Sequence, residues 1–158
     1  MSSKIFLDSS ILVEYRKGIQ TDLLEAIVAN QVFTPVISQV VVSEYLFYHL
    51  AIFSGKSPMS VKSAGEIDKY LSIGDPDTFL AQFAWLQDFP TLFKKGSHFM
   101  RKYNLLPNDA LILANCQFQK IKYLASFDSD YIIACQEEGI QLISSTADLE
   151  TITEFRTS

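Results

Sequence analysis

Five acidic residues lie within apolar segments or directly after them, where charged side chains are unusual. These residues are Asp8, Glu44, Asp109, Asp128 and Asp130. Asp8 follows the apolar run Ile5–Leu7, and Glu44 is the only acid in "SQVVVSEYLFYHLAIF", residues 38–53. Burial of an unpaired carboxylate costs several kcal/mol, so such a group should be paired, protonated or bound to a metal ion.

Carboxylates gathered at one place would predict a site for divalent cations. Like charges close together repel one another and raise each other's pKa, and a bound cation relieves that repulsion. Ligands that are all oxygen atoms favour Mg²⁺ or Mn²⁺, which keep several water molecules when bound. Such a site polarises a phosphoryl oxygen and generates hydroxide from bound water. The chemistry that this predicts is phosphodiester hydrolysis.

Each acid also has a simpler explanation, which the sequence alone leaves open. Asp8, Asp109 and Asp130 could cap helices or interact with their N-terminal dipoles. Glu44 could be a hydrogen-bonded core residue or part of an interface. Asp128 lies nearest to the end of an apolar strand, which makes it a better ligand candidate than Asp130.

Other catalytic patterns are weak in this chain. His49 and His98 lack a ligand partner at helical spacing, and we expect both at the surface or in an interface. The six glycines form no phosphate-binding loop. An aspartyl-phosphate enzyme would need a second aspartate two residues after Asp8, where the chain has Ser10.

Predicted strands and helices alternate along the chain. Strands are expected at residues 4–8, 31–35, 122–126 and 140–144, and helices at 9–15, 21–30, 39–53, 61–73, 77–87, 94–103, 107–120 and 129–138. Residues 89–93 are ambiguous between a loop and a short strand. This order predicts an α/β fold, a three-layer α/β/α sandwich with a mainly parallel sheet. Ligand sites in such sheets lie at the carboxyl ends of strands, where Asp8 and Asp128 are expected.

Composition indicates a globular protein without a membrane segment. The 158 residues are 48% hydrophobic and 20% charged, and no apolar run approaches the ~18 residues of a membrane span. Cys116 and Cys135 lie in apolar stretches, which favours buried thiols in a reduced, cytoplasmic protein. The net charge of −5 argues against a nucleic-acid binder, unless several of the acids hold cations.

Four stretches, in this order, resemble the PIN-domain ribonucleases, in particular the VapC-type toxins of bacterial type II toxin–antitoxin pairs. They are "FLDSSILVEY", "VVVSEYLFY", "YNLLPNDALILANC" and "YLASFDSDY". The resemblance implies a single PIN-like domain over residues 1–150, with a variable helical insertion at about 54–75 that begins in the linker "SGKSPMS". Residues 151–158 are expected to form a frayed tail.

The resemblance also implies roles for individual residues. Asp8, Glu44, Asp109 and Asp128 match the catalytic acids that bind Mg²⁺ or Mn²⁺ in that family, and Asp130 matches an accessory metal ligand. Ser10 and Ser126 match hydroxyls that orient a water molecule or a carboxylate, although threonine is more usual at the position of Ser126. Arg16 is our best candidate for an RNA phosphate contact, because it closes the helix that begins beside Asp8.

The expected partners are an RNA substrate, an antitoxin protein and a second copy of the chain. The aromatic-rich stretch 45–53 is more apolar than one core face requires, which a homodimer face or an antitoxin groove would explain. Two other functions stay open. One is a catalytically inactive PIN-like module that binds RNA or protein, and the other is a metal-dependent phosphatase for small phosphoesters.

Overall fold

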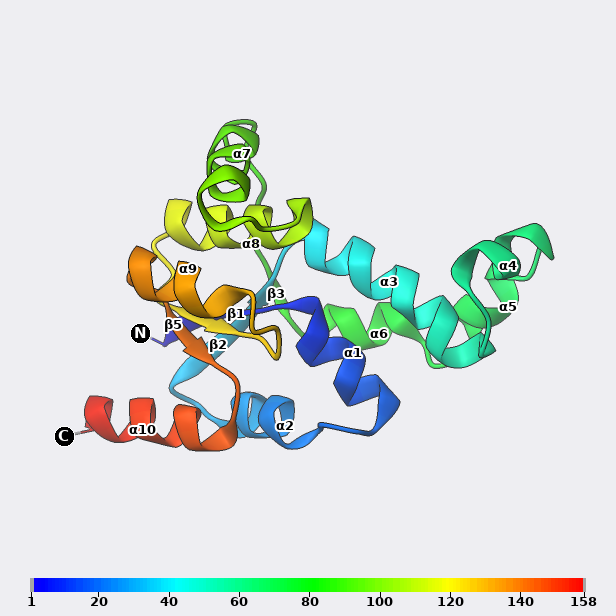
Figure 1. Ribbon diagram of the computed structural model, residues 1–158. Coiled ribbons are helices and arrows are strands. Elements are labelled where there is room, and N and C mark those ends of the chain that lie inside the picture. Colours follow the sequence, from blue (N-terminus) through cyan, green and yellow to red (C-terminus); the bar gives the residue numbers. More distant parts are fainter. Residues whose placement is uncertain (1, 158) are drawn as a thin grey trace.

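A parallel sheet of five strands forms the centre of the molecule. The computed structural model describes residues 2–157 and orders the strands β3-β2-β1-β4-β5 (Figure 1). The strands are β1 (Ser3–Leu7), β2 (Phe33–Ile37), β3 (Ala84–Trp85), β4 (Tyr123–Ala125) and β5 (Gln141–Ile143). The chain builds the sheet outward from β1 and then crosses to β4 on its other side, so the strand order reverses between β1 and β4. Ligand sites in such sheets lie in the crevice at this reversal.

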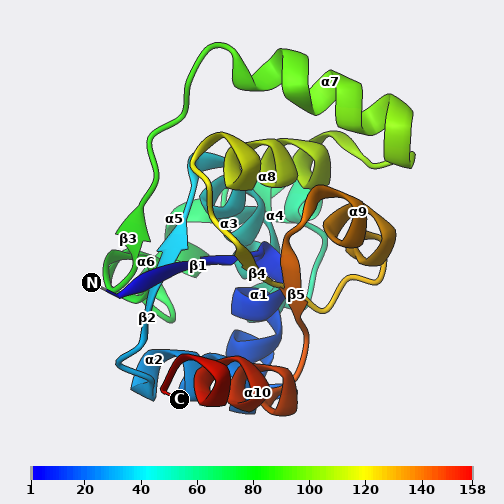
Figure 2. The same ribbon diagram turned by 90° about the vertical axis from the view of Figure 1, so that its left-hand side faces the viewer.

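Helices cover both faces of the sheet, as the predicted sandwich requires. They are α1 (Ser9–Lys17), α2 (Asp22–Ala29), α3 (Gln39–Ser54), α4 (Pro58–Ser63), α5 (Ile67–Ser72), α6 (Pro76–Ala81), α7 (Leu92–Tyr103), α8 (Pro107–Phe118), α9 (Tyr131–Glu138) and α10 (Thr146–Thr157). In Figure 2, α8 lies on one face with α7 outside it, and α2 and α10 lie on the other. No helix in this part of the chain has the length and hydropathy needed to cross a membrane.

The central strand and α8 form the core that holds the site. Ile5, Phe6 and Leu7 of β1 have no exposed surface, as expected for a strand covered on both faces. Pro107 occupies the first turn of α8, as predicted. The core continues through α8, where Ala110, Ile112, Leu113, Ala114 and Cys116 are also fully buried. Both cysteines are buried and free, as expected.

The sheet edge differs from the predicted one. β2 extends to Ile37 rather than ending at Pro35, which pairs with Ile5 inside the strand. The pairing of β2 with β3 begins only at Val36, so Pro35 lies where that side of β2 is still an edge, which proline tolerates. β3 follows α6, which ends at Ala81 instead of continuing to residue 87, and residues 89–93 form no strand. A two-residue strand is too short for its alternation to be recognised in a sequence.

The C-terminal segment is helical instead of frayed. Residues 151–157 form the second half of α10. Leu149 and Ile152 are 3% and 4% exposed, and α10 packs on α2 and β5. This apolar pair at helical spacing gives the segment a buried face, which the tail prediction overlooked.

Residues 58–72, inside the predicted insertion, form α4 and α5 at the far end of α3 from the sheet (Figure 1). His49 holds this segment and is fully buried inside the chain, so the surface or interface position expected for it is wrong. Its Nε2 lies 3.0 Å from the carbonyl oxygens of both Tyr70 and Ile73. Two carbonyl partners require an N–H at Nε2, and in the neutral ring with that tautomer Nδ1 accepts a hydrogen bond from the Tyr45 hydroxyl at 3.3 Å. His98 is exposed, as expected.

Candidate active site

Four of the predicted acids gather at the carboxyl edge of the sheet. Asp8 follows β1 and Asp128 follows β4, while Glu44 projects from α3 and Asp109 from the first turn of α8. Burial raises the pKa of Asp109 to about 6, with further contributions from the charges of Asp8, Asp128 and Glu44. Burial also raises the pKa of Glu44, together with the charges of Asp8 and Asp128. These carboxylates therefore lie within one another's electrostatic field.

Asp8 both caps a helix and belongs to this cluster. It is 4% exposed and is the N-cap residue of α1, which is the simpler explanation that the sequence offered for it. Its Oδ2 accepts hydrogen bonds from the Ser10 hydroxyl at 2.6 Å and from the Ser10 backbone N–H at 3.3 Å. The Ser126 hydroxyl donates to the same oxygen at 2.7 Å. The helix cap, one of the explanations that the sequence left open for Asp8, is therefore present, and its role as a metal ligand stays a prediction.

Two serine hydroxyls connect the ends of β1 and β4. The Ser10 hydroxyl accepts a hydrogen bond from the Phe127 backbone N–H at 3.1 Å. The Ser126 hydroxyl, fully buried, accepts one from the Asp128 backbone N–H at 3.0 Å. Each hydroxyl therefore donates to Asp8 and accepts from the loop after β4. This arrangement would fix both the direction of the Asp8 carboxylate and the position of Asp128.

Asn108 and Tyr131, to which sequence reasoning gave no role, contact the half-buried acids, and the Ser9 side chain also hydrogen-bonds Glu44. The Asn108 amide donates to Glu44 Oε2 at 3.4 Å, and the hydroxyl of fully buried Tyr131 donates to Asp109 Oδ1 at 3.3 Å. Both residues lie in stretches singled out above, next to Asp109 and to Asp130. The sequence therefore showed which residues lie beside the acids along the chain, but not the direction in which their side chains point.

The Asp130 carboxylate and Arg16 lie outside this cluster of contacts. Asp130 is exposed, and its backbone N–H donates to Asp128 Oδ1 at 2.9 Å. The Arg16 guanidinium donates to the Gly74 carbonyl oxygen and lies 5.3 Å and 4.8 Å from the ring centroids of Phe53 and Phe79. Arg16 thus attaches α1 to the segment before α6. Its contact with RNA stays a prediction.

The donor set fits a hard divalent cation that retains water. Over residues 2–157, no three His, Cys, Asp or Glu side chains form a preassembled metal cage. The cluster supplies carboxylate and hydroxyl oxygens, with no imidazole or thiolate. Mg²⁺ binds through one or two carboxylates and keeps several waters. A cation could therefore be held by some of these acids directly and by the others through water.

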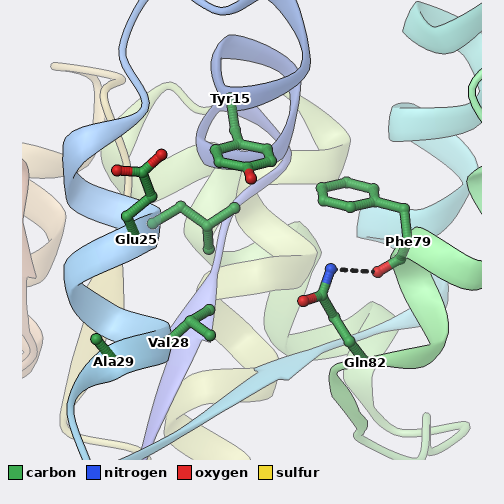
Figure 3. Close-up of a pocket in the computed structure, with 7 residues that line it drawn as sticks. Tyr15, Glu25, Val28, Ala29, Phe79 and Gln82 are labelled. Atoms are coloured by element: carbon green, nitrogen blue, oxygen red, sulfur yellow. Dashed lines mark hydrogen bonds between the residues drawn. The ribbon is translucent and has the colours of Figure 1, made fainter.

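A cavity of about 250 Å³ lies apart from the acids, between α1, α2 and α6. In Figure 3 the Tyr15 and Phe79 rings border it, together with Val28 of α2 and with Gln82, whose side-chain amide donates to the Phe79 carbonyl oxygen. The Tyr15 and Phe79 rings are parallel, with centroids 5.8 Å apart. None of the predicted site residues lines this cavity, so the carboxylate cluster is the better candidate site.

Comparison with known proteins finds matches over most of the chain. The PIN domain family model matches residues 5–137. Ribonuclease VapC2 of Methanocaldococcus jannaschii is 34% identical over 130 residues, covering 82% of this chain and 87% of the relative. Ribonuclease VapC6 of the same organism is 29% identical over 145 residues, covering 82% and 91%.

Solved structures share the fold. A toxin–antitoxin complex from Klebsiella pneumoniae matches with a TM-score of 0.58 and 16% identity, over 89% of this chain and 96% of that one. VapBC2 from Rickettsia felis, bound to a DNA fragment from its promoter, matches with a TM-score of 0.57 and 16% identity, over 89% and 99%. At this identity the likeness bears on the fold alone.

Proposed function

This chain belongs to the PIN domain family, and we propose on that basis that it is an endoribonuclease that hydrolyses RNA phosphodiesters with Mg²⁺ or Mn²⁺. The observation that carries the proposal is the convergence of Asp8, Glu44, Asp109 and Asp128 at the reversal point of the sheet, with the pKa of Asp109 raised to about 6. Relatives that are named ribonucleases support the choice of substrate.

In this proposal the acids share the work of holding the cation. Asp8, Glu44 and Asp109 are the primary ligands, Asp128 completes the set directly or through water, and Asp130 is an accessory ligand at the rim. The bound ion would activate water for in-line attack on the phosphodiester, leaving a 5′-phosphate and a 3′-hydroxyl.

The remaining residues orient these ligands. Ser10 and Ser126 direct the Asp8 carboxylate through their hydroxyls. Tyr131 donates to Asp109, and Asn108 donates to Glu44. In this proposal Arg16 contacts an RNA phosphate, although its guanidinium also donates a hydrogen bond to the Gly74 carbonyl oxygen.

We further propose that the chain is the toxin of a toxin–antitoxin pair and works in the cytoplasm as a homodimer. Phe47 and Tyr48 of α3, 52% and 43% exposed, lie in the turn after Glu44. Their apolar surface beside the acids suits an antitoxin that covers the site or a second copy of the chain. In the same proposal, residues 1–150 form one PIN-like domain whose variable insertion spans about 54–75.

The alternative is a catalytically inactive PIN-like module that binds RNA or protein. The net charge of −5 and the absence of a preassembled cage over residues 2–157 favour it. The two functions differ in whether the site binds a divalent cation and whether the bound form cleaves RNA.

Thermal unfolding with and without Mn²⁺ tests the site before any RNA target is known. Ligand binding to the folded state stabilises it by RT ln(1 + [L]/Kd), so the wild type should unfold at a higher temperature with Mn²⁺. Asp8→Asn should lose this rise and, without metal, should match or exceed the wild type because a repulsion is relieved. Asn keeps an acceptor for the helix cap.

The control is Glu150→Gln, which neutralises an exposed acid of α10 and should keep the full response. No Mn²⁺ effect in the wild type, together with an Asp8→Asn variant that is merely less stable, would favour the inactive module. If the wild type does respond to Mn²⁺, cleavage of an RNA by the wild type but not by Asp8→Asn would establish the nuclease.

A further inference from the structure

Helix α7 concentrates positive charge in an otherwise acidic chain. Of the 13 Lys and Arg residues, four lie in Leu92–Tyr103, together with His98 and without any of the 18 acids. The basic residues are Lys94, Lys95, His98, Arg101 and Lys102, and we call them the basic face of α7. Their spacing of one, four, seven and eight residues places them on one side of a helix.

The opposite side of α7 packs on α8, which carries Asp109. Leu92, Gly96 and Phe99 are buried on this side. A Cβ atom at Gly96 would lie 2.9 Å from Leu111 Cδ2, so the two helices approach closely at this point. Leu111 lies two residues after Asp109, so this close contact is within one turn of the candidate site. Figure 2 shows α7 as the outermost helix on this face.

Part of the basic face is already neutralised and part is free. The Lys102 ammonium pairs with Glu138 at 3.0 Å and Glu137 at 3.4 Å. Lys94 and Arg101 are exposed, and within residues 2–157 no carboxylate lies in ion-pair distance of either. These two cations carry unneutralised charge of α7, as does the partly buried Lys95, whose ammonium lies 4.9 Å from the Phe99 ring centroid.

Two hollows border the basic face, one toward each end of α7. The first, of about 520 Å³, is lined by Lys94, Lys95, His98 and by Phe118 of α8, whose side chain is 50% exposed. The second, of about 470 Å³, is lined by Lys102, Tyr103, Asn104, Ser129, Asp130, Ile133, Ala134 and Glu137. Ser129 and Asp130 directly follow Asp128, so the second hollow lies between Lys102 of the basic face and the loop that carries Asp128.

We infer that the basic face of α7 binds the phosphate backbone of single-stranded RNA, which reaches the carboxylates through the second hollow. The inference rests on the proposed function, because it assigns a path to the substrate of that site. Cations beside an exposed aromatic ring are typical of sites for single-stranded nucleic acids, whose bases stack on the ring. Phe118 thus favours RNA over an acidic protein segment, which would need the charges but not the ring.

Binding of a fluorescein-labelled 20-nucleotide uridine oligomer, measured by anisotropy at several salt concentrations in EDTA, tests this inference. EDTA prevents metal-dependent cleavage, so the result does not depend on catalysis. The test variant is Lys94→Gln with Arg101→Gln. The control, Lys4→Gln with Lys122→Gln, removes the same charge from two exposed lysines at the amino edge of the sheet, opposite the carboxylates.

For single strands, log K falls with log salt by about 0.7 for each phosphate neutralised. The α7 variant should therefore bind several-fold more weakly, with a salt slope reduced by about 1.4, and the control should match the wild type. Equal losses in both variants would show that only net charge matters and would overturn the inference. An unchanged α7 variant would also overturn it, even if the wild type cleaves RNA.

Poly-L-glutamate, as a second labelled probe, distinguishes a protein partner from RNA. If the α7 variant loses affinity for this polymer but not for the RNA, the basic face binds an acidic protein instead of RNA, and the inference is wrong. Cleavage with Mn²⁺ is measured separately. A wild type that binds RNA through α7 without cleaving it would retain the inference and reject the nuclease.

Discussion

The hydroxyl of Ser126 donates a hydrogen bond of 2.7 Å to Oδ2 of Asp8, across a separation of 118 residues in the chain. Asp8 directly follows β1 and Ser126 directly follows β4, the two strands between which the sheet order reverses. The direction of the Asp8 carboxylate is therefore set by the neighbouring strand as well as by its own helix cap.

Ser126→Ala should weaken both the fold and metal binding. Its hydroxyl takes part in two hydrogen bonds, one to Asp8 Oδ2 and one from the Asp128 backbone N–H, each worth about 1 kcal/mol of unfolding free energy, and Asp8 keeps its contacts with Ser10. Loss of a group that orients a metal ligand typically costs about 10-fold to 100-fold in affinity. Calorimetric titration with Mn²⁺ measures the affinity, with exposed Ser63→Ala as control. Wild-type affinity in Ser126→Ala would refute an orienting role.

Asp109 should make the metal-free protein less stable as the pH rises. Its pKa of about 6 in the folded state lies above the ordinary 3.8. Between these values the folded chain binds more protons than the unfolded chain, so the unfolding free energy falls with rising pH and is lowest above about pH 6. Metal binding removes this proton, so Mn²⁺ affinity should fall below about pH 6.

Asp109→Asn checks the sign of this effect. In EDTA at about pH 7.5 the variant should be more stable than the wild type by about 1 to 2 kcal/mol, a figure reduced for the partial exposure of the side chain. The advantage should shrink toward about pH 4. Urea unfolding at both pH values measures it, and Glu150→Gln is the control. A variant less stable than the wild type at both pH values would contradict the prediction.

Tyr131→Phe should shift the pH dependence of metal binding. The Tyr131 hydroxyl donates to Asp109 Oδ1 at 3.3 Å and thereby lowers the pKa of that carboxyl. Without the hydroxyl, the pKa of Asp109 should rise further, and the pH at which Mn²⁺ binding is half lost should move upward. Titrations over a pH series measure this midpoint. Tyr48→Phe, which removes a hydroxyl from a partly exposed ring of α3, should leave the midpoint unchanged.

His49→Leu should loosen the segment after α5 without disturbing the carboxylates. The substitution removes the hydrogen bonds from Nε2 to the Tyr70 and Ile73 carbonyls and should lower the unfolding free energy by about 2 kcal/mol. Limited proteolysis should cut residues 58–74 faster than in the wild type, while Mn²⁺ affinity is kept. His49→Gln retains a donor, so its rate of proteolysis should lie between those of the wild type and His49→Leu. Equal cleavage rates would show that the histidine does not hold this segment.

The sequence by itself determined the parts of the fold that depend on local signals. The apolar run of β1, the proline at the start of α8 and the alternation of strands with helices predicted a parallel sandwich with these elements in place. Each signal lies within one element, where side-chain periodicity and capping act over a few residues. Four short stretches that contain the acids, taken in their order along the chain, likewise identified the family and the candidate site residues.

Only the tertiary structure decided how those residues meet. The contacts of Ser126 with Asp8 and of Tyr131 with Asp109 join elements that are remote in sequence. The buried position of His49 depends on carbonyl groups more than 20 residues away, and Arg16 is attached to Gly74 for the same kind of reason. Residue types and local periodicity do not encode strand register or the direction of a side chain across a packed interface, because both depend on how all the elements pack together.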